Sequence, residues 1–487
     1  MSLYERIKRR CYDNNCLYID ISEKGVHKSS YGSDLISKSI HISNVLNTTF
    51  PKRNIFIWLD DCHSFIPIFW ACLASAMPVM PIALISSKAN KRLQERKRIL
   101  KLLSQLNAVV IVNDFTLAQN KSIESLPNID CIQLDSLMST NALQPSDHIK
   151  ENELAFVLQT SGTTGNAKYA CFSNEWFDYE TFNGRKVISL FPLGTSTGIA
   201  FGYALNLISA YIPLHLAFKD PKILFETIEI YQIEVLIIPP VIIARLLDFM
   251  ANKSERIYDM SSVKSLNIGS STILLNKVDD LQRQIRKWNG LQTTIYLAYG
   301  LTETGGVAYG PFTNAKDHMC AQGVIIGPIR QGVEVLTKSN YPGQVEEILV
   351  RRNFNFIGYA KPNQAYEWSL TKFEGGYDYF KTGDLGVVRE GKLILSGRGK
   401  DIIILNSRKQ SLAEIERFIL NQWPNEIKEV IACASPEEKL LLFIINDLES
   451  INLSTCFLKL REAITIDLNC HFGCSPSDIR CIKSINV

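Results

Sequence analysis

The chain has 487 residues, of which 46% are hydrophobic and 21% charged, a composition typical of globular proteins. Its 52 basic and 49 acidic side chains leave a net charge of +3, which is too balanced to indicate binding to nucleic acid or to an anionic membrane. The length exceeds what one compact core holds, so we expect two or three domains.

The 12 cysteines are scattered along the chain without a disulfide framework, so we expect reduced thiols and a cytoplasmic location. Cys470, His471 and Cys474 lie close together, but nothing nearby completes a zinc-binding set. A zinc site is therefore not expected there.

Two stretches bear on targeting. The first ten residues are charged where a signal peptide needs an apolar segment. Residues 64–87 carry no charge and are long enough to cross a bilayer, but Pro67, Pro78 and Pro81 interrupt them. A buried helix followed by a short strand at 79–84 is the better interpretation, and we expect no membrane partner.

Residues 1–150 alternate helical patterns with short apolar runs. The runs 54–59 and 108–112 are rich in β-branched residues, and the charged stretch 88–105 between them is typical of a surface helix. This alternation predicts a mainly parallel sheet with crossover helices.

Residues 159–168 form a polar turn after the apolar run 154–158. Two glycines, several hydroxyl side chains and a closing lysine offer hydrogen bonds and a mobile positive charge to phosphate oxygens. The spacing is not that of a Walker loop, and taken alone the stretch could be an ordinary turn at a strand end.

Later strands also end at small or hydroxyl residues. The runs 187–191, 265–268 and 294–298 do so, whereas the run 234–238 stops at two prolines before a helix at 241–250. Ligands of open α/β sheets bind beyond the carboxyl ends of strands, so we expect a site where these ends meet.

From Gly332 the pattern changes to strands of a smaller subdomain, at 343–351 and 392–395. The turn 397–400, with two glycines and two cations, is the best boundary. We therefore predict an α/β fold: a large N-terminal domain (1–396) of mainly parallel sheets with flanking helices, followed by a small mobile α+β domain (397–487).

Four motifs together resemble the adenylate-forming superfamily, which includes acyl-CoA synthetases, fatty acyl-AMP ligases and adenylation domains of peptide synthetases. They lie at 160–168, 299–303, 381–384 and 397–401, in the family's order and approximate spacing. Residues 358–359 and 411–416 fit the same pattern, so the resemblance covers nearly the whole chain. It implies that ATP and a carboxylic acid form an acyl-AMP, with release of pyrophosphate and later transfer of the acyl group.

The resemblance implies roles at the phosphate end of the nucleotide. Glu303 would hold Mg²⁺, because a hard cation takes oxygen ligands, and Thr302 would donate to the α-phosphate. The triphosphate would bind to the loop and its lysine: Thr160, Ser161, Gly162, Thr163, Thr164, Gly165 and Lys168.

Further roles concern the nucleoside, the hinge and the acid. Tyr299 resembles the aromatic that stacks on adenine, and Asp384 the acceptor of both ribose hydroxyls. Lys400 matches the hinge of the small domain and counts, with Lys168, Thr302 and Glu303, among the catalytic residues. The remaining residues implied at the nucleotide are Ser270, Gly300 and Arg398, and those implied at the acid are Gly194, Thr195, Gly269 and Gly305.

Each motif has a structural alternative. Thr302 and Glu303 could begin a helix, with the acid favourable in its first turn. Residues 382–384 could form a simple turn, and Arg398 could be a surface charge. For a single motif the structural alternative is as good as the functional interpretation, but four motifs in register favour the family.

Three departures from the family pattern matter. Ala167 replaces the proline that usually precedes the loop lysine, and Thr195 offers no carboxylate for the ammonium of an α-amino acid. The chain ends about where the family's last motif, a Gly-Lys that carries the adenylating lysine, is expected; Lys483 is near but lacks that context.

We therefore expect activation of a carboxylic acid with Mg·ATP and transfer to a thiol, of CoA or of an acyl carrier protein, with adenylation impaired. The hinge sequence is nearest to that of fatty acyl-AMP ligases. Two alternatives stay open: a protein that binds the adenylate or nucleotide without efficient turnover, and an enzyme that performs only the acyl transfer.

Overall fold

The computed structural model divides the chain into two compact units. Unit 1 comprises Met1–Ile273, Asp279–Val307 and Arg352–Asp378, and unit 2 comprises Leu274–Val278, Ala308–Arg351 and Tyr379–Val487. This division does not test the predicted boundary at residue 397, which stays a prediction. The residues that the structure describes are 16–21, 27–59, 62–82, 89–119, 123–124, 126, 128–139, 154–160, 168–173, 176, 185–202, 212–216, 220–252, 257–320, 322–337, 345–352, 356–363, 367–372, 379–399, 402–405, 408–423, 427, 429–434, 439–445, 453–472 and 476–482.

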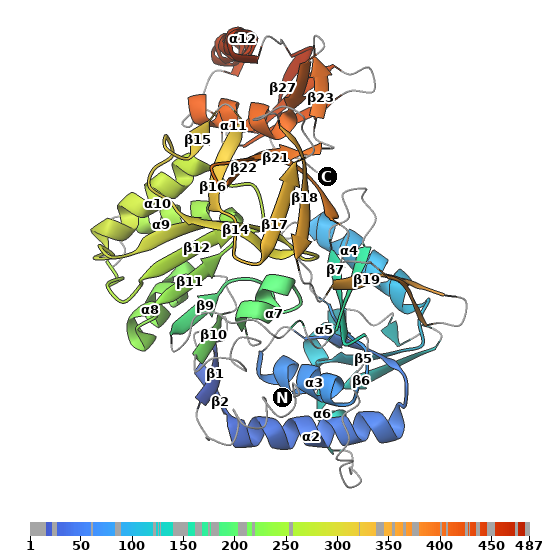
Figure 1. Ribbon diagram of the computed structural model, residues 1–487. Helices are drawn as coiled ribbons and strands as arrows, with labels where there is room; N and C mark the ends of the chain where they lie inside the picture. The colour runs from blue at the N-terminus through green and yellow to red at the C-terminus, as the bar shows by residue number, and fades with distance from the viewer. Residues whose placement is uncertain are drawn as a thin grey trace. The chain divides into compact units, whose positions relative to one another are not determined.

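One eight-stranded sheet, mainly of unit 1, has the order β14-β13-β12-β11-β9-β10-β1-β2 (Figure 1). Pairing is parallel from β13 to β1. The bounds are β1 Cys16–Ile21, β2 His27–Tyr31, β9 Lys186–Ser189, β10 Ile212–Leu216, β11 Val235–Ile238, β12 Ser265–Gly269, β13 Thr294–Leu301 and β14 Gly305–Pro311.

A second eight-stranded sheet of unit 1 has the order β20-β19-β8-β7-β4-β3-β5-β6. Its strands from β7 to β6 are parallel, and β8, β19 and β20 add antiparallel pairs. The bounds are β3 Asn54–Trp58, β4 Val79–Pro81, β5 Ala108–Val112, β6 Ile129–Gln133, β7 Phe156–Thr160, β8 Lys168–Phe172, β19 Phe356–Pro362 and β20 Trp368–Lys372.

Helices connect the parallel strands, as the alternating pattern predicts. Pro221 begins α8 at a position that needs no N–H donor, and Asp220 caps it by accepting from the N–H of Lys222. The bounds are α2 Gly32–Thr49, α3 Cys62–Ala74, α4 Ala89–Leu103, α5 Asp114–Gln119, α6 Leu134–Ser139, α7 Ser196–Gly202, α8 Pro221–Tyr231, η4 Pro240–Ile242, α9 Ile243–Ala251 and α10 Leu275–Lys287.

Residues 64–82 of the apolar stretch fold as predicted, into α3 and the short strand β4, with Pro67 inside the helix; residues 83–87 lie outside the described residues. Phe65, Phe69 and Trp70 are buried. Among the described residues, no helix combines the length and apolar character needed to cross a membrane.

The parallel strands β9, β11, β12 and β13 are neighbours, so their carboxyl ends lie at one edge of the first sheet. The residues directly after these ends are Leu190, Pro239, Ser270 and Thr302. The predicted meeting of strand ends is confirmed for this sheet, whereas the strand before the polar loop, β7, belongs to the second sheet.

Unit 2 contains a six-stranded sheet in the order β15-β16-β22-β21-β18-β17. Its pairings from β15 to β18 are antiparallel, consistent with the predicted change after Gly332. The bounds are β15 Met319–Cys320, β16 Gly323–Pro328, β17 Val333–Thr337, β18 Glu346–Arg352, β21 Phe380–Arg389 and β22 Lys392–Arg398.

The C-terminal part of unit 2 has a core of its own. Ile415 and Ile419 of α11 and Ile464 and Leu468 of α12 are buried in one cluster with the strand residue Leu442. The bounds are β23 Ile402–Leu405, β24 Arg408–Ser411, α11 Leu412–Gln422, β25 Glu429–Ala434, β26 Leu440–Ile445, α12 Leu453–Phe472 and β27 Asp478–Ile482.

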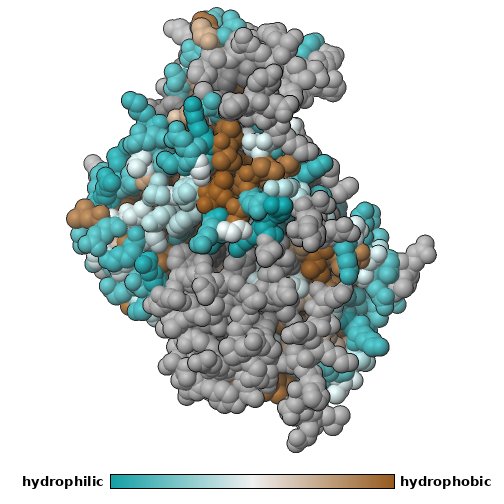
Figure 2. Space-filling view, viewed as in Figure 1, coloured by the Kyte–Doolittle hydropathy of each residue, from teal (hydrophilic) through white to brown (hydrophobic). Residues whose placement is uncertain are grey.

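The surface of unit 2 is not uniformly polar. Figure 2 shows a brown, apolar area among teal, hydrophilic side chains in the upper half of the view. Large apolar side chains exposed on the strands of this unit include Met319 on β15 and Leu336 on β17, the latter 46% exposed.

Candidate functional site

The residues Thr302 and Glu303 lie in the tight connection between β13 and β14. A side chain at Gly300 would place its Cβ 2.1 Å from the carbonyl oxygen of Gly305, and Gly305 itself has φ +58°. The hairpin therefore needs both glycines, one for close approach and one for the left-handed conformation. This geometry excludes the alternative in which Thr302 and Glu303 begin a helix.

The Glu303 carboxylate is only 8% exposed and has a specific partner. The hydroxyl of Tyr359 donates a hydrogen bond to Glu303 Oε1 at 2.6 Å. Burial, followed by the charge of Glu303, raises the pKa of Tyr359, so the phenol keeps its proton and remains a donor. Glu303 follows a strand of the first sheet and Tyr359 lies on β19 of the second, so this bond links the two sheets of unit 1.

The ammonium of Lys168 lies 4.8 Å from the centre of the Tyr359 ring. Lys168 begins β8, and β8 pairs with β19 so that Ala170 faces Tyr359. Gly358 permits the close pairing of β19 with β20, because a Cβ there would lie 2.0 Å from the carbonyl oxygen of Thr371. We name Lys168, Glu303 and Tyr359 the Glu303 cluster.

The polar loop itself lies outside the described residues, as does the predicted hinge. The strands on either side of the polar loop are described. Thr160 of β7 is buried and pairs with Lys168 of the antiparallel strand β8. The predicted site residues that lie outside the described part of the chain are Ser161, Gly162, Thr163, Thr164, Gly165 and Lys400.

The ends of β12 and β13 hold further predicted residues. Gly269 faces Ala298 in the parallel pairing, and a Cβ at Gly269 would lie 2.7 Å from the Ala298 carbonyl oxygen. Ser270 has φ +73°, which is unfavourable for a residue with a side chain and which is found preferentially at functional sites. Tyr299 is buried in β13.

Thr195 has a local structural role. Its hydroxyl donates to the carbonyl of Pro192 at 2.7 Å and accepts from the N–H of Gly198 at 3.0 Å, at the start of α7. The neighbouring Ser196 instead lies with its hydroxyl 3.3 Å from that of Thr302. Gly194 precedes this pair in the same turn.

In unit 2, residues Thr382, Gly383 and Asp384 bulge out of β21. Lys381 pairs with Leu349 of β18 and Leu385 with Glu347, so three residues of β21 face the single residue Ile348. Gly383 has φ +73°, which glycine adopts without strain. We name these three residues the Asp384 bulge; it is a strand feature, not the simple turn that the sequence left open.

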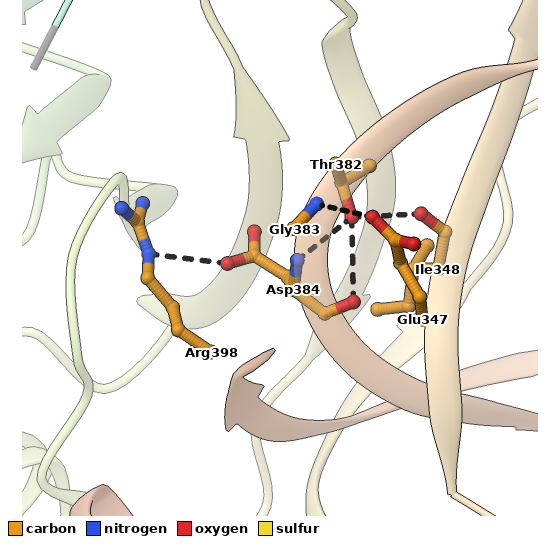
Figure 3. A network of polar contacts seen from close by, with 6 residues as sticks. All are labelled: Glu347, Ile348, Thr382, Gly383, Asp384 and Arg398. Atoms are coloured by element: carbon orange, nitrogen blue, oxygen red, sulfur yellow. Dashed lines mark hydrogen bonds and ion pairs between the residues drawn. The ribbon is translucent and has the colours of Figure 1, made fainter. Parts of the chain in front are cut away.

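Contacts fix the Asp384 bulge from both sides (Figure 3). The hydroxyl of Thr382 donates to the carbonyl of Ile348 at 2.8 Å and accepts from the N–H of Asp384 at 3.0 Å. The Gly383 N–H donates to Glu347 Oε1 at 3.1 Å. The bulge is thus held by backbone groups and two side chains.

Asp384 and Arg398, predicted from separate motifs, face each other across β21 and β22. Arg398 Nε lies 3.1 Å from Asp384 Oδ1; the Asp384 side chain is 7% exposed and that of Arg398 46%. Arg398 is therefore a partner of Asp384 and not an isolated surface charge.

Three contacting residues were not among the predicted site residues. Tyr359 belongs to the dipeptide 358–359 that fits the family pattern, and that was its only signal in the sequence. Ser196 directly follows a predicted residue, and Glu347 is one of two adjacent glutamates without a distinguishing feature.

The profile of the AMP-binding enzyme family matches residues 25–360. Among known proteins, the inactive atromentin synthetase invA3 of Paxillus involutus is 23% identical over 453 residues, which are 82% of this chain and 46% of that protein. The aspulvinone E synthetase melA of Aspergillus terreus is 24% identical over 419 residues, 78% of this chain and 43% of that protein. The chain thus spans less than half the length of these relatives.

The fold also has a close counterpart among solved structures. A structure from work on fatty acyl-adenylate ligases of E. coli and L. pneumophila superposes with a TM-score of 0.82 at 17% identity, over 100% of this chain and 95% of that one. This likeness confirms the predicted α/β fold, with its large N-terminal and small C-terminal domains. The family profile covers more than half of the sequence, and the chain belongs to the AMP-binding enzyme family.

Proposed function

We propose that this chain activates a carboxylic acid with Mg·ATP, forming an acyl-AMP and pyrophosphate. The observation that carries the proposal is the Glu303 cluster, in which a lysine and a glutamate from two family motifs contact the same tyrosine. A positive and a negative group fixed in this way suit phosphates and their counter-ion. The acyl group would then pass to a thiol, of CoA or of an acyl carrier protein.

Glu303 fits a magnesium site by its chemistry. Mg²⁺ prefers oxygen ligands and is commonly held by one or two carboxylates together with substrate phosphates. Within the described ranges, no three His, Cys, Asp or Glu side chains gather into a metal site, so Glu303 would share the ion with phosphate oxygens. When bound, Mg²⁺ would neutralise phosphate charge, while Tyr359 keeps the Glu303 carboxylate in place.

Residues of this chain would divide the remaining work. The Lys168 ammonium would attract the β- and γ-phosphates, and the Thr302 hydroxyl, beside Ser196, would donate to the α-phosphate. In unit 2 the Asp384 carboxylate would accept the ribose hydroxyls, with Arg398 beside it. Tyr299 would stack on the adenine, with Gly300 and Ser270 near the nucleotide.

The substrate would be an acid without an α-ammonium group. The Thr195 hydroxyl serves the start of α7 and carries no negative charge for such a group. Gly194, Gly269 and Gly305 would lie beside the acid, as the family resemblance implies.

An alternative is a protein that binds the adenylate or nucleotide without efficient turnover, or one that performs only the acyl transfer. The observation in its favour is that one relative bears the name of an inactive synthetase.

The test is acid-dependent exchange of labelled pyrophosphate into ATP, over a panel of fatty, aryl, keto, hydroxy and α-amino acids. We expect exchange with an acid that lacks the α-ammonium, and a loss of about 1–3 kcal/mol of transition-state stabilisation in Lys168→Ala. The control is Lys361→Ala, which removes an exposed lysine of β19 in the same sheet.

If no acid of the panel supports pyrophosphate exchange, the proposed activation of a carboxylic acid is contradicted. If AMP then still binds, or supplied acyl-AMP still transfers its acyl group to a thiol, the alternative holds instead. Equal exchange rates in Lys168→Ala and Lys361→Ala would remove Lys168 from the site.

A further inference from the structure

The side chain of Glu347 contacts the Asp384 bulge. It pairs with Leu385, at the point where the register between β18 and β21 shifts. From there its carboxylate accepts the Gly383 N–H at 3.1 Å, as Figure 3 shows. The amide at the centre of the bulge is therefore held by a side chain of the neighbouring strand.

The direction of the Asp384 side chain depends on this amide. Asp384 directly follows Gly383, which has a left-handed backbone conformation. Glycine adopts several other backbone conformations at similar energy, so its neighbours must hold it in this one. The Thr382 hydroxyl fixes the side of the bulge before Gly383, through the Ile348 carbonyl, and Glu347 fixes Gly383 itself. Because Asp384 is nearly buried, it has little room to recover its orientation if the bulge changes shape.

We propose that Glu347 is a positioning residue, which fixes the Gly383 peptide and so aims the Asp384 carboxylate at the diol of a ribose. This inference rests on the proposed function, in which Asp384 accepts the ribose hydroxyls. Glu347 itself would not touch the nucleotide. Its contribution should therefore appear in discrimination between nucleotides with and without the diol.

The experiment measures binding of AMP and of 2′,3′-dideoxy-AMP to the full chain by calorimetry. For wild type we expect AMP to bind at least about tenfold more tightly, because hydrogen bonds to a charged acceptor are lost with the hydroxyls. In Glu347→Ala that ratio should fall to about two- or threefold. In Glu347→Gln it should remain near the wild-type value, because the amide oxygen can still accept the Gly383 N–H.

The matched control is Glu346→Ala, since adjacent side chains of a strand point to opposite faces. It removes a carboxylate from the same strand and should leave the ratio unchanged. Thermal melts accompany each variant. If Glu347→Ala does not fold, Glu347→Asp replaces it, because its oxygen is one methylene too short to reach Gly383.

Two failures can be told apart. Equal binding of AMP and dideoxy-AMP by wild type would overturn the role of Asp384, and this inference with it. A wild type that discriminates while Glu347→Ala, or Glu347→Asp in its place, discriminates equally well would overturn only the role of Glu347. A ratio that falls as much in Glu346→Ala as in the Glu347 variant would also overturn it.

Discussion

The Glu303 cluster and the Asp384 bulge each hold a carboxylate, but in different ways. In the Glu303 cluster, Tyr359 on another strand provides a neutral donor to the carboxylate and a ring to Lys168. In the Asp384 bulge, the backbone itself is displaced from the sheet and fixed by hydrogen bonds around Gly383. One carboxylate is held by a side chain that touches it, the other through the path of its main chain.

This difference implies different sensitivities to mutation. Replacing Tyr359 should loosen Glu303 without changing the hairpin, because the hairpin depends on Gly300 and Gly305. Replacing Gly383 should disturb Asp384 without removing any contact of its side chain. The following predictions, from the largest expected effect to the smallest, test this distinction.

Asp384→Asn should weaken AMP binding about 10- to 100-fold, because hydrogen bonds from the ribose to a charged acceptor become bonds to a neutral one. The measurement is calorimetric titration with AMP. Thermal stability should fall only modestly, since Asn preserves the shape of the side chain and the ion pair that it removes is with the partly exposed Arg398. Unchanged AMP affinity would exclude Asp384 from the ribose site.

Glu303→Gln should raise the Mg²⁺ concentration for half-maximal pyrophosphate exchange about tenfold, because a carboxylate ligand becomes an amide. The melting temperature should hold, since the Gln oxygen can still accept from the Tyr359 hydroxyl. The control is Glu334→Gln, an exposed carboxylate of unit 2 paired with Arg351. An identical metal dependence in wild type and Glu303→Gln would rule out the metal role.

Gly383→Ala should weaken AMP binding several-fold and lower the free energy of unfolding by about 1–2 kcal/mol. Nothing lies within 4 Å of a Cβ at this position, so the cost arises from the left-handed backbone and not from a clash.

Gly391→Ala provides the control, because Gly391 has the same φ of +73° and equally open surroundings. This variant should lose a similar amount of stability but should bind AMP as tightly as wild type. Equal loss of affinity in both variants would mean that the bulge has no special part in binding.

Tyr359→Phe should raise the Mg²⁺ requirement about two- to threefold and cost about 0.5–1.5 kcal/mol of stability, the contribution of one hydrogen bond. The ring over Lys168 remains. Because burial and the Glu303 charge raise the pKa of Tyr359, the difference between wild type and variant should stay constant up to about pH 10, the ordinary value for tyrosine. A difference that disappears between pH 6 and 8 would mean that another group is responsible.

Sequence reasoning predicted most of the fold because the parallel strands of unit 1 are apolar runs with clear ends. The run 108–112 became β5 without change, and the prolines at 239–240 correctly marked the end of β11. The hairpin after β13 was less evident, because glycines at 300 and 305 indicate a tight turn but not its partner strand.

The site was predictable only in part. Asp384 and Arg398 were found through separate motifs, but their pairing depends on the register of β21 and β22, which no local pattern fixes. Glu347 and Tyr359 make their contacts with segments distant in sequence, so Glu347 has no local signal and Tyr359 only the dipeptide 358–359. The roles of all the site residues remain predictions, and the loop residues and Lys400 also lie outside the described residues.

The most direct test of the central proposal compares AMP and Mg·ATP binding to wild type, Asp384→Asn and Glu303→Gln. We predict that Asp384→Asn weakens both ligands, because both carry the ribose. Glu303→Gln should weaken only Mg·ATP, because AMP lacks the β- and γ-phosphates that would share the ion. Loss of AMP affinity in Glu303→Gln equal to that in Asp384→Asn, or no loss of affinity for either ligand in both variants, would contradict the proposed roles of Asp384 as ribose acceptor and Glu303 as magnesium ligand.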